Sequence, residues 1–345
     1  MTVKTKMKIL ITGGAGYIGS HTAVVLFTSG YEPIIIDDFR NSNKSSLEGI
    51  KKITGKDPET HIGDCSDQIF LAETLSKIGK VDGVIHFAGL KAVGKSVAEP
   101  LSYYQNNINA LLSILCEMKA HSIPAIIFSS SATVYGDPDN LPITENFPRK
   151  KATSPYGNTK QICEDILDDT VKSNSFPLRV VSLRYFNPIG AHPSGHIGEL
   201  PIGAPNNLVP YLTQAAAGKR KELTVFGNDY PTPDGTGIRD YIHVMDMAEA
   251  HVAALSYLLS EKKSTSNLYD IFNVGTGSGT SVLELISKFE EINATKVPHI
   301  IGPRRSGDIA SCYADASKIK RALGWSAKRS ISEALKDAWN WEKKS

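Results

Sequence analysis

The sequence predicts an α/β protein with a Rossmann-type, doubly wound parallel sheet and a smaller C-terminal domain. Three observations support this fold class. Short apolar strands alternate with amphipathic helical segments over the first half of the chain, as in parallel sheets covered by helices on both faces. A glycine-rich loop, Gly13–Gly19, joins the first strand to a helix. After Gly190 the alternation lapses and proline and glycine become frequent, which indicates a second domain.

The strands of the predicted sheet are short apolar runs. In chain order they are expected at Lys8–Thr12, Pro33–Asp37, Thr60–Gly63, Gly83–Phe87, Ala125–Ser129 and Arg179–Leu183. Helices are expected at Ile18–Ser29, Tyr103–Ala120 and Tyr156–Ser173. Gly30 ends the first helix and Pro155 marks the start of the last one.

The predicted domains are residues 1–190, a Rossmann domain to which residues 238–275 partly return, and residues 191–345. Between Ala191 and Gly237 we expect mainly loops, which often carry specificity on a rigid scaffold. Periodic patterns that indicate further elements resume at Ile242–Leu259 and Val282–Glu291.

Composition narrows the class of protein. The 345 residues are 41% hydrophobic and 21% charged, with a net charge of +2, as in an ordinary globular protein. The basic residues are scattered, which does not favour binding of nucleic acid or a membrane surface. No apolar run approaches the roughly 20 residues that span a bilayer, and the N-terminus lacks a signal-peptide core. The four cysteines lack metal-ligand spacing, so we expect reduced thiols in the cytoplasm and no metal.

The glycine loop predicts dinucleotide binding. Gly13, Gly16 and Gly19 follow a strand and open a helix, so the backbone can turn tightly and approach a pyrophosphate. Asp37 ends the second strand, where a carboxylate can accept a hydrogen bond from a ribose 2′-OH and repel a 2′-phosphate. This favours NAD over NADP, although Arg40 lies close enough to weaken the preference and Asp37 could instead be a cap or turn residue.

A Tyr-x-x-x-Lys pair, Tyr156 and Lys160, predicts proton-transfer chemistry. Positions i and i+4 share a helix face, so the ammonium can sit beside the phenol and favour its ionised form. Ser131 follows a strand of the sheet, at the edge where ligands of open α/β sheets bind. It could hydrogen-bond a substrate hydroxyl and pass its proton to Tyr156. His86 lies inside a buried strand and is interpreted as structural.

Long strings of the sequence resemble the extended short-chain dehydrogenase/reductase superfamily and, within it, the UDP-galactose 4-epimerases. They are GGAGYIGSHT at 13–22, HFAGLKAV at 86–93, SSSATVYG at 129–136, RYFNPIGAHPSG at 184–195, PNNL at 205–208 and FGNDYPTPDGTGIRDYIHVMD at 226–246. The resemblance extends from about Lys8 to Trp341. It implies an enzyme of galactose metabolism that uses tightly bound NAD to oxidise C4 of a UDP-hexose to a 4-keto sugar, with hydride returned to the other face.

The resemblance also implies a role for individual residues. Tyr156 would be the acid/base, Ser131 its hydrogen-bonding partner, and Lys160 the cation that tunes Tyr156 and holds the nicotinamide ribose. The implied NAD contacts are Gly13, Gly16, Tyr17, Ile18, Gly19, Asp37, Asp64, Phe87, Ala88, Gly89, Lys91, Asn106 and Tyr185. The implied UDP-sugar contacts in residues 191–345 and just before are Asn187, Asn206, Asn207, Leu208, Phe226, Arg239, Arg305, Asp308 and Cys312.

Cys312 is implied to border the 2-substituent of the sugar, where family members carry either a tyrosine or a small residue. Its small side chain suggests that UDP-GalNAc and UDP-GlcNAc are also interconverted, although a buried free thiol is the simpler interpretation. The family further implies a homodimer that pairs the helices near 103–120 and 156–173. Ile162, Ile166 and Leu167 could equally pack on their own sheet.

Three other functions stay open on the sequence. Related 4,6-dehydratases resemble Thr-Asp-Glu where this chain has Ser131-Ala132-Thr133, and the missing carboxylates count against water elimination. An NAD-dependent dehydrogenase would share the same catalytic residues. A nucleotide-sensing binding protein would have no need for Ser131, Tyr156 and Lys160 together.

Overall fold

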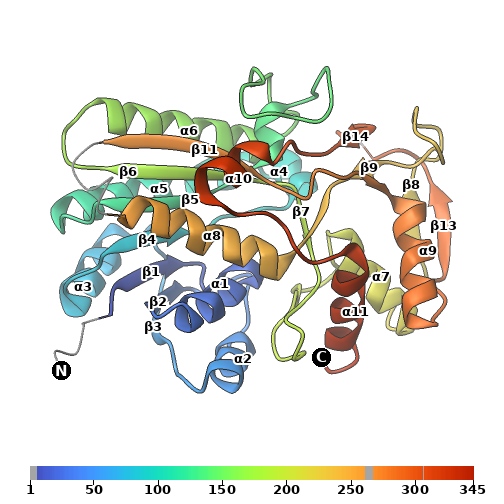
Figure 1. Cartoon of the computed structure of the whole chain (residues 1–345), viewed down its shortest axis with the longest axis horizontal. Coiled ribbons are helices and arrows are strands. Elements are labelled where there is room, and N and C mark those ends of the chain that lie inside the picture. Colours follow the sequence, from blue (N-terminus) through green and yellow to red (C-terminus); the bar gives the residue numbers. More distant parts are fainter. Residues whose placement is uncertain (1–5, 261–266, 306) are drawn as a thin grey trace.

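The computed structural model describes residues 6–260, 267–305 and 307–345. Its centre is a seven-stranded sheet in the order β11-β6-β5-β4-β1-β2-β3, with every neighbouring pair parallel (Figure 1). The strands are β1 (Lys8–Thr12), β2 (Glu32–Asp37), β3 (Glu59–Ile62), β4 (Gly83–His86), β5 (Ala125–Ser131), β6 (Arg179–Tyr185) and β11 (Leu268–Val274). The predicted Rossmann-type fold is confirmed.

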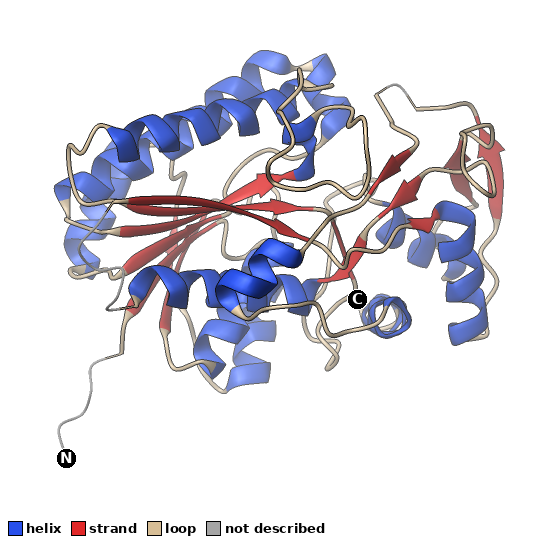
Figure 2. Cartoon of the chain, turned by 45° about the horizontal axis from the view of Figure 1, so that its top comes forward, coloured by secondary structure: helices blue, strands red, loops and turns tan. Residues whose placement is uncertain are grey.

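Two hydrophobic cores lie on opposite faces of this sheet, because successive strand residues point to opposite sides. In β1, Ile9 and Ile11 belong to one core and Leu10 to the other. The first core is covered by α1 (Tyr17–Thr28), α2 (Ser45–Thr54), α8 (Val244–Leu259) and α10 (Ser317–Leu323). The second is covered by α3 (Gln68–Ile78), α5 (Pro100–Ala120) and α6 (Pro155–Lys172). Figure 2 shows the resulting three layers, with the sheet between two layers of helices.

The chain returns to this sheet after forming the first part of a second unit. Strand β11 pairs with β6 in parallel register from Leu268↔Arg179 to Val274↔Tyr185 and forms one edge of the sheet. Helix α8 packs against α1 on the first face. The seven-stranded sheet is therefore assembled from segments on both sides of the loop-rich region.

The second unit lies at one end of the molecule (Figure 1). Its core joins α7 (Leu208–Ala216), α9 (Val282–Asn293) and α11 (Ile331–Glu342) to a parallel pair, β8 (Leu223–Phe226) and β13 (His299–Gly302). Smaller pairings are β10 (Tyr241–His243) with β7 (Asn187–Ile189), and β9 (Ile238–Arg239) with β12 (Thr280–Ser281) and β14 (Ser311–Cys312). Two short helices, α4 (Val93–Ala98) and η1 (Ala132–Tyr135), follow β4 and β5.

Loops make up most of residues 191–237, as expected, but α7 and β8 also lie there. The prolines before and within the first turn of α7 obscure its helical pattern in the sequence. Pro210 occupies the first turn of α7, where backbone N–H groups have no partner within the helix and proline costs little. Among the described residues, no helix is long and apolar enough to cross a membrane.

Candidate active site

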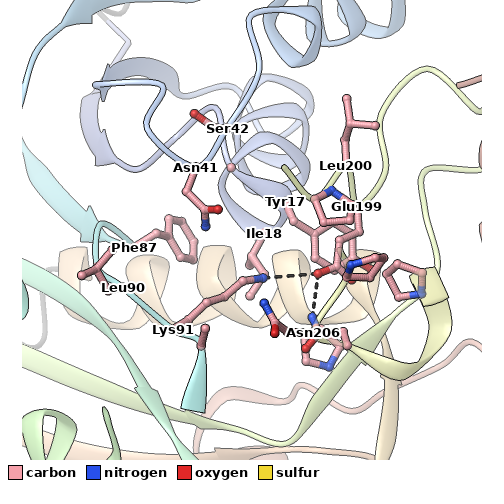
Figure 3. A pocket seen from close by; sticks show the side chains of 18 of the residues that line it. Tyr17, Ile18, Asn41, Ser42, Phe87, Leu90, Lys91, Glu199, Leu200 and Asn206 are labelled. Carbon is pink, nitrogen blue, oxygen red and sulfur yellow. Dashed lines mark hydrogen bonds and ion pairs between the residues drawn. The ribbon is translucent and has the colours of Figure 1, made fainter. Parts of the chain in front are cut away.

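A cavity of about 890 Å³ lies at the carboxyl ends of the sheet strands, bordered by the loops of the second unit. Every residue that the sequence suggested for chemistry, cofactor or substrate lines this cavity except Cys312. Figure 3 shows part of it, with Tyr17 and Ile18 from α1, Phe87 and Lys91 after β4, and Glu199 from the loop that precedes α7. Segments that are far apart in the chain therefore share one ligand-sized space.

The glycine loop forms a cradle that side chains would fill. Gly13 has φ +70°, and a Cβ there would lie 2.8 Å from the backbone nitrogen of Ala88. A Cβ on Gly19 would lie 2.4 Å from the carbonyl oxygen of Gly13, and one on Gly16 would lie 3.1 Å from it. Because α1 begins at Tyr17, its N-terminal N–H groups open onto this cradle. The loop fits the pyrophosphate of a dinucleotide.

Asp37 is buried beside the loop with a carboxylate held in place. Its Oδ2 accepts a hydrogen bond from the Ala15 N–H at 2.9 Å, and its Oδ1 accepts from the Ser42 hydroxyl at 2.6 Å. The Phe39 N–H, at 2.9 Å, also donates to Oδ1. A carboxylate in this position can accept from ribose hydroxyls while it braces the glycine loop.

Arg40 is engaged by two acids, which bears on the choice between NAD and NADP. Its guanidinium lies 2.9 Å from a carboxylate oxygen of Asp38 and 2.7 Å from one of Asp64. Hydrogen bonding to Asp64 raises the pKa of Arg40, so the group stays charged within this cluster of carboxylates. The surroundings of a 2′-phosphate would therefore be acidic, and the cradle fits NAD better than NADP.

Tyr156, Lys160 and Ser131 meet where α6 crosses the ends of the strands. Lys160 lies one turn after Tyr156, and its Nζ is 5.9 Å from the centre of the phenol ring. The same Nζ donates to the Ser129 carbonyl at 2.6 Å and lies 4.8 Å from the ring centre of Phe128. Tyr156 interacts with the Ser131 side chain. The helix begins where it does because the Ser154 hydroxyl accepts from the Gly157 N–H and Pro155 occupies the first turn.

The pKa values of this pair differ from the sequence expectation. Burial raises the pKa of Tyr156 to about 12, and the interaction with Ser131 opposes this only in part. Burial also lowers the pKa of Lys160 to about 8. The sequence suggests that Lys160 lowers the pKa of Tyr156, but in the chain alone desolvation of the phenol has the largest effect and the pKa is raised.

An aromatic cluster borders the cavity near the glycine loop and the Tyr156–Lys160 pair. The ring of His251, on α8, lies 4.7 Å from Phe87 and 5.2 Å from Tyr185, measured between ring centres. The Tyr185 hydroxyl hydrogen-bonds His251 Nε2. Tyr185 is the register partner of Ser131, so the sheet itself brings these two predicted residues together. His86 is buried and hydrogen-bonded to the Thr12 hydroxyl at 2.7 Å, as a structural histidine would be.

The second unit presents cations, amides and one exposed ring to the cavity. Arg239 lies 3.5 Å from the Asp308 carboxylate, and Arg305 lies 5.6 Å from the ring centre of Phe226. Phe226 ends β8 and is 44% exposed, so its ring is free to stack on a base. Two guanidinium groups beside such a ring suit a nucleoside diphosphate. The remaining predicted substrate contacts on this side are Asn187, Asn206, Asn207 and Leu208.

Cys312, the remaining implied substrate contact, lies beside the cavity. Its thiol is buried, 9% exposed, in a cluster with Val134, Tyr135 and Phe186, and it is not part of the cavity wall. Cys312 remains close to the site through its register partner in β9, Arg239.

Sequence analysis missed several residues that line the cavity. Glu199, Ser42 and Tyr241 are among them. Tyr241 begins β10, two residues after Arg239, so the alternation of side chains there could have indicated it. Glu199 lies in the proline-rich stretch before α7, where no periodic pattern distinguishes it.

Comparisons with known proteins agree with this site. Residues 10–338 match the family model described as GDP-mannose 4,6 dehydratase. The UDP-glucose 4-epimerase of Bacillus subtilis is 53% identical over 337 residues, covering 97% of both chains. That of Dictyostelium discoideum is 49% identical, covering 97% of this chain and 95% of the relative.

Solved structures give the same result. The crystal structure of UDP-glucose 4-epimerase from Bifidobacterium longum, in complex with NAD⁺ and UDP, superimposes with a TM-score of 0.93. It is 47% identical and the match covers 98% of each chain. The enzyme from Stenotrophomonas maltophila, with NAD and formylated UDP-arabinopyranose, also has a TM-score of 0.93, at 46% identity and 98% coverage of both. The chain therefore belongs to the UDP-glucose 4-epimerase family, within the larger family that the dehydratase model describes.

Proposed function

We propose that this protein is an NAD-dependent epimerase that interconverts UDP-galactose and UDP-glucose at C4 of the hexose. The observation that carries the proposal is that one cavity joins the glycine cradle, the Tyr156–Lys160 pair and the arginines of the second unit. Cofactor, reacting carbon and nucleotide diphosphate would thus be held in a single enclosed space. The relatives that match the chain over nearly its full length support the same activity.

The chain's own residues account for the proton transfer and the binding. NAD⁺, when bound, supplies reversible oxidation of C4. Tyr156 removes the proton of the 4-OH group and returns it once the 4-keto sugar has turned over in the cavity. Ser131 hydrogen-bonds the same oxygen and links it to Tyr156. Lys160 places a positive charge beside the phenol, while Arg239 and Arg305 retain the diphosphate during the turn.

The phenolate must form despite a pKa of about 12 for Tyr156 in the chain alone. The oxidised nicotinamide ring is cationic, and a cation in the cavity favours the phenolate as Lys160 does. The proton affinity of Tyr156 would thus fall when the oxidised cofactor is in place. Tyr156 must act as a base before C4 is oxidised, and that is the stage at which the bound cofactor is in its oxidised form.

Three competing activities fit the chain less well. Elimination of water needs a further acid and base, and Ala132 and Thr133, in η1 beside Ser131, supply no carboxylate. A dehydrogenase would have to exchange its cofactor in each turnover. A nucleotide-sensing protein would have no need for Tyr156 and Lys160.

One incubation tests the proposal. Purified protein mixed with UDP-galactose, without added NAD, should form UDP-glucose with no net NADH. Substrate loss that requires added NAD and forms an equal amount of NADH would identify a dehydrogenase instead, and a dehydrated 4-keto sugar would identify a dehydratase. Binding of UDP-galactose without any product would identify a sensor.

We further propose that N-acetylated UDP-hexoses are also substrates. The support is the small side chain at Cys312, next to Arg239 in register and packed in one cluster with Phe186. Cys312→Tyr should abolish conversion of UDP-GlcNAc and leave that of UDP-galactose, because a larger side chain would project from this cluster toward the cavity. Equal loss of both activities, or absence of UDP-GlcNAc conversion in the wild type, would contradict this.

A homodimer in the cytoplasm is the proposed state of the protein. Leu101 and Leu112 on α5 are 81% and 42% exposed, while Leu167 on α6 packs into the second core, so α5 offers the apolar contact. Leu112→Glu should yield a monomer in light scattering after gel filtration. Ile301→Glu, at a similarly exposed residue on β13, should leave the dimer intact. A wild type that elutes as a monomer would refute the dimer.

A further inference from the structure

A buried carboxylate lies behind the Tyr156–Lys160 pair. Glu164 and Arg184 are each only 2% exposed. Glu164 Oε1 accepts from Arg184 Nε at 3.0 Å, and its Oε2 accepts from Arg184 Nη2 at 2.7 Å. The Ser130 hydroxyl also donates to Oε1, at 2.6 Å. Three donors on two strands thus converge on one side chain of α6.

On β5, the residue that Glu164 contacts lies between the residues that Lys160 and Tyr156 contact. Tyr156, Lys160 and Glu164 are spaced i, i+4 and i+8, so they lie along one face of α6. On β5 their partners are three consecutive serines: Ser131 for Tyr156, the Ser129 carbonyl for Lys160, and Ser130 for Glu164. Three side chains of α6 are thus joined to three consecutive residues of β5.

Arg184 extends the connection to the next strand. In the register of β5 with β6, Arg184 is opposite Ser130 and Tyr185 is opposite Ser131. Its guanidinium also lies 4.6 Å from the ring centre of Tyr135 in η1. Glu164 therefore ties α6 to β5 and β6 one residue away from the cavity wall.

Stability alone is a weak reason for such an arrangement. Removing two charges from water costs several kcal/mol per ion, and well-packed apolar residues in place of a buried ion pair are often neutral or stabilising. Hydrogen bonds from a guanidinium and a hydroxyl, by contrast, fix distance and direction. A negative charge on the same helix face also opposes the lowering of the Lys160 pKa that burial causes.

We propose that Glu164 is a positioning residue for the epimerase reaction. It fixes α6 on β5 and β6 so that the Tyr156 hydroxyl meets Ser131 and Lys160 stays at the Ser129 carbonyl. It does not touch substrate or cofactor. The inference rests on the proposed function, because it concerns the geometry of that reaction.

The variant Ser130→Ala separates positioning from folding. It removes the link between Glu164 and β5 while the Glu164–Arg184 ion pair remains. We expect kcat for UDP-galactose to fall by about tenfold, the factor that one hydrogen bond to a charged group typically represents. KM and the amount of NAD that copurifies should stay unchanged. The matched control is Ser182→Ala, at a buried serine of β6 whose hydroxyl pairs instead with Tyr269 at 3.2 Å, and it should retain wild-type kcat.

The double variant Glu164→Met/Arg184→Met covers the case in which a single charge change prevents folding. Both buried charges are removed together, so the protein should fold with a melting temperature near that of the wild type. Its kcat should nevertheless fall by at least the factor seen for Ser130→Ala. Wild-type kcat in Ser130→Ala or in the double variant would overturn the positioning role. Failure of the proposed function itself would be distinct, because the wild-type protein would then form no UDP-glucose.

Discussion

Lys91 and Glu199 form an ion pair across the cavity, with Nζ 3.3 Å from Oε1 (Figure 3). The two residues are 108 positions apart, one after β4 and the other before α7. The same Oε1 accepts from the side-chain amide of Asn207 at 2.6 Å, and the backbone carbonyl of Glu199 accepts from the indole N–H of Trp341 at 3.0 Å. One anchored carboxylate thus joins a proposed cofactor contact to a proposed substrate contact.

Removal of this carboxylate should weaken substrate binding. Glu199→Ala leaves Asn207 without its acceptor, so the Kd for UDP, measured by calorimetry on the NAD-loaded protein, should rise by about tenfold. Glu199→Gln keeps an acceptor for Asn207 and should lose less. Glu73→Ala, at an exposed glutamate on α3, serves as the control. An unchanged Kd in Glu199→Ala would show that Asn207 needs no such support.

The glycine cradle should tolerate no side chain at its third glycine. In Gly19→Ala the new Cβ would lie 2.4 Å from the Gly13 carbonyl oxygen and 2.8 Å from Gly14 Cα, so the loop must shift. We expect most of the NAD that copurifies to be lost, as measured by its release on denaturation. Gly94→Ala on α4, where nothing lies within 4 Å of the added Cβ, should retain it. Full NAD content in Gly19→Ala would mean that the cofactor does not depend on this loop.

Tyr156→Phe should remove the acid/base and little else. Loss of a general base typically lowers turnover by about 10²–10⁴-fold, and kcat for UDP-galactose should fall within that range. The phenyl ring still fills the space beside Lys160, so NAD content and the Kd for UDP should be preserved. Near-normal kcat would assign the proton transfer to another group.

Lys160 should give the apoprotein a pH dependence of stability above neutrality. Its pKa is about 8 in the folded chain and 10.5 is its ordinary value, so between these the unfolded state binds more protons. The free energy of unfolding should therefore rise with pH between about 8 and 10.5, relative to Lys160→Met, by up to about 1.4 kcal/mol per pH unit. Urea titrations of the two proteins measure this. A constant difference across that range would place the lysine in a more solvated setting than the structure gives it.

Local patterns in the chain were sufficient for much of the fold. The first strand, Lys8–Thr12, lies within the bounds that its apolar run predicts, because a buried strand that meets a glycine loop has clear ends. Helix α7 was not foreseen, since Pro210 usually marks a break and only its place in the first turn makes it compatible with a helix. The position of the proline within the helix decides whether the helix can form, and residue spacing alone does not reveal that position.

The same contrast holds within the site. The glycines and Tyr156 with Lys160 are recognisable because their partners are a few residues away in the chain. Glu199 and Arg184 obtain their roles from residues that are distant in sequence, and a lone glutamate or arginine is most often a solvated surface residue. Cys312 was implied by a family position alone, and its buried place in a cluster with Phe186 could not be predicted from local spacing.

The position of β11 has a consequence for the order of synthesis. This edge strand ends at Val274 in a chain of 345 residues, and α8 lies before it in the chain, yet β11 completes the sheet that begins at Lys8 and α8 covers one of its faces. The part of the second unit that contains α7 and β8 is therefore synthesised before the sheet of the first unit can close. The nascent chain would expose the β6 edge and one side of α1 during that interval, so the apolar surface there is open to chaperones until α8 and β11 have been synthesised.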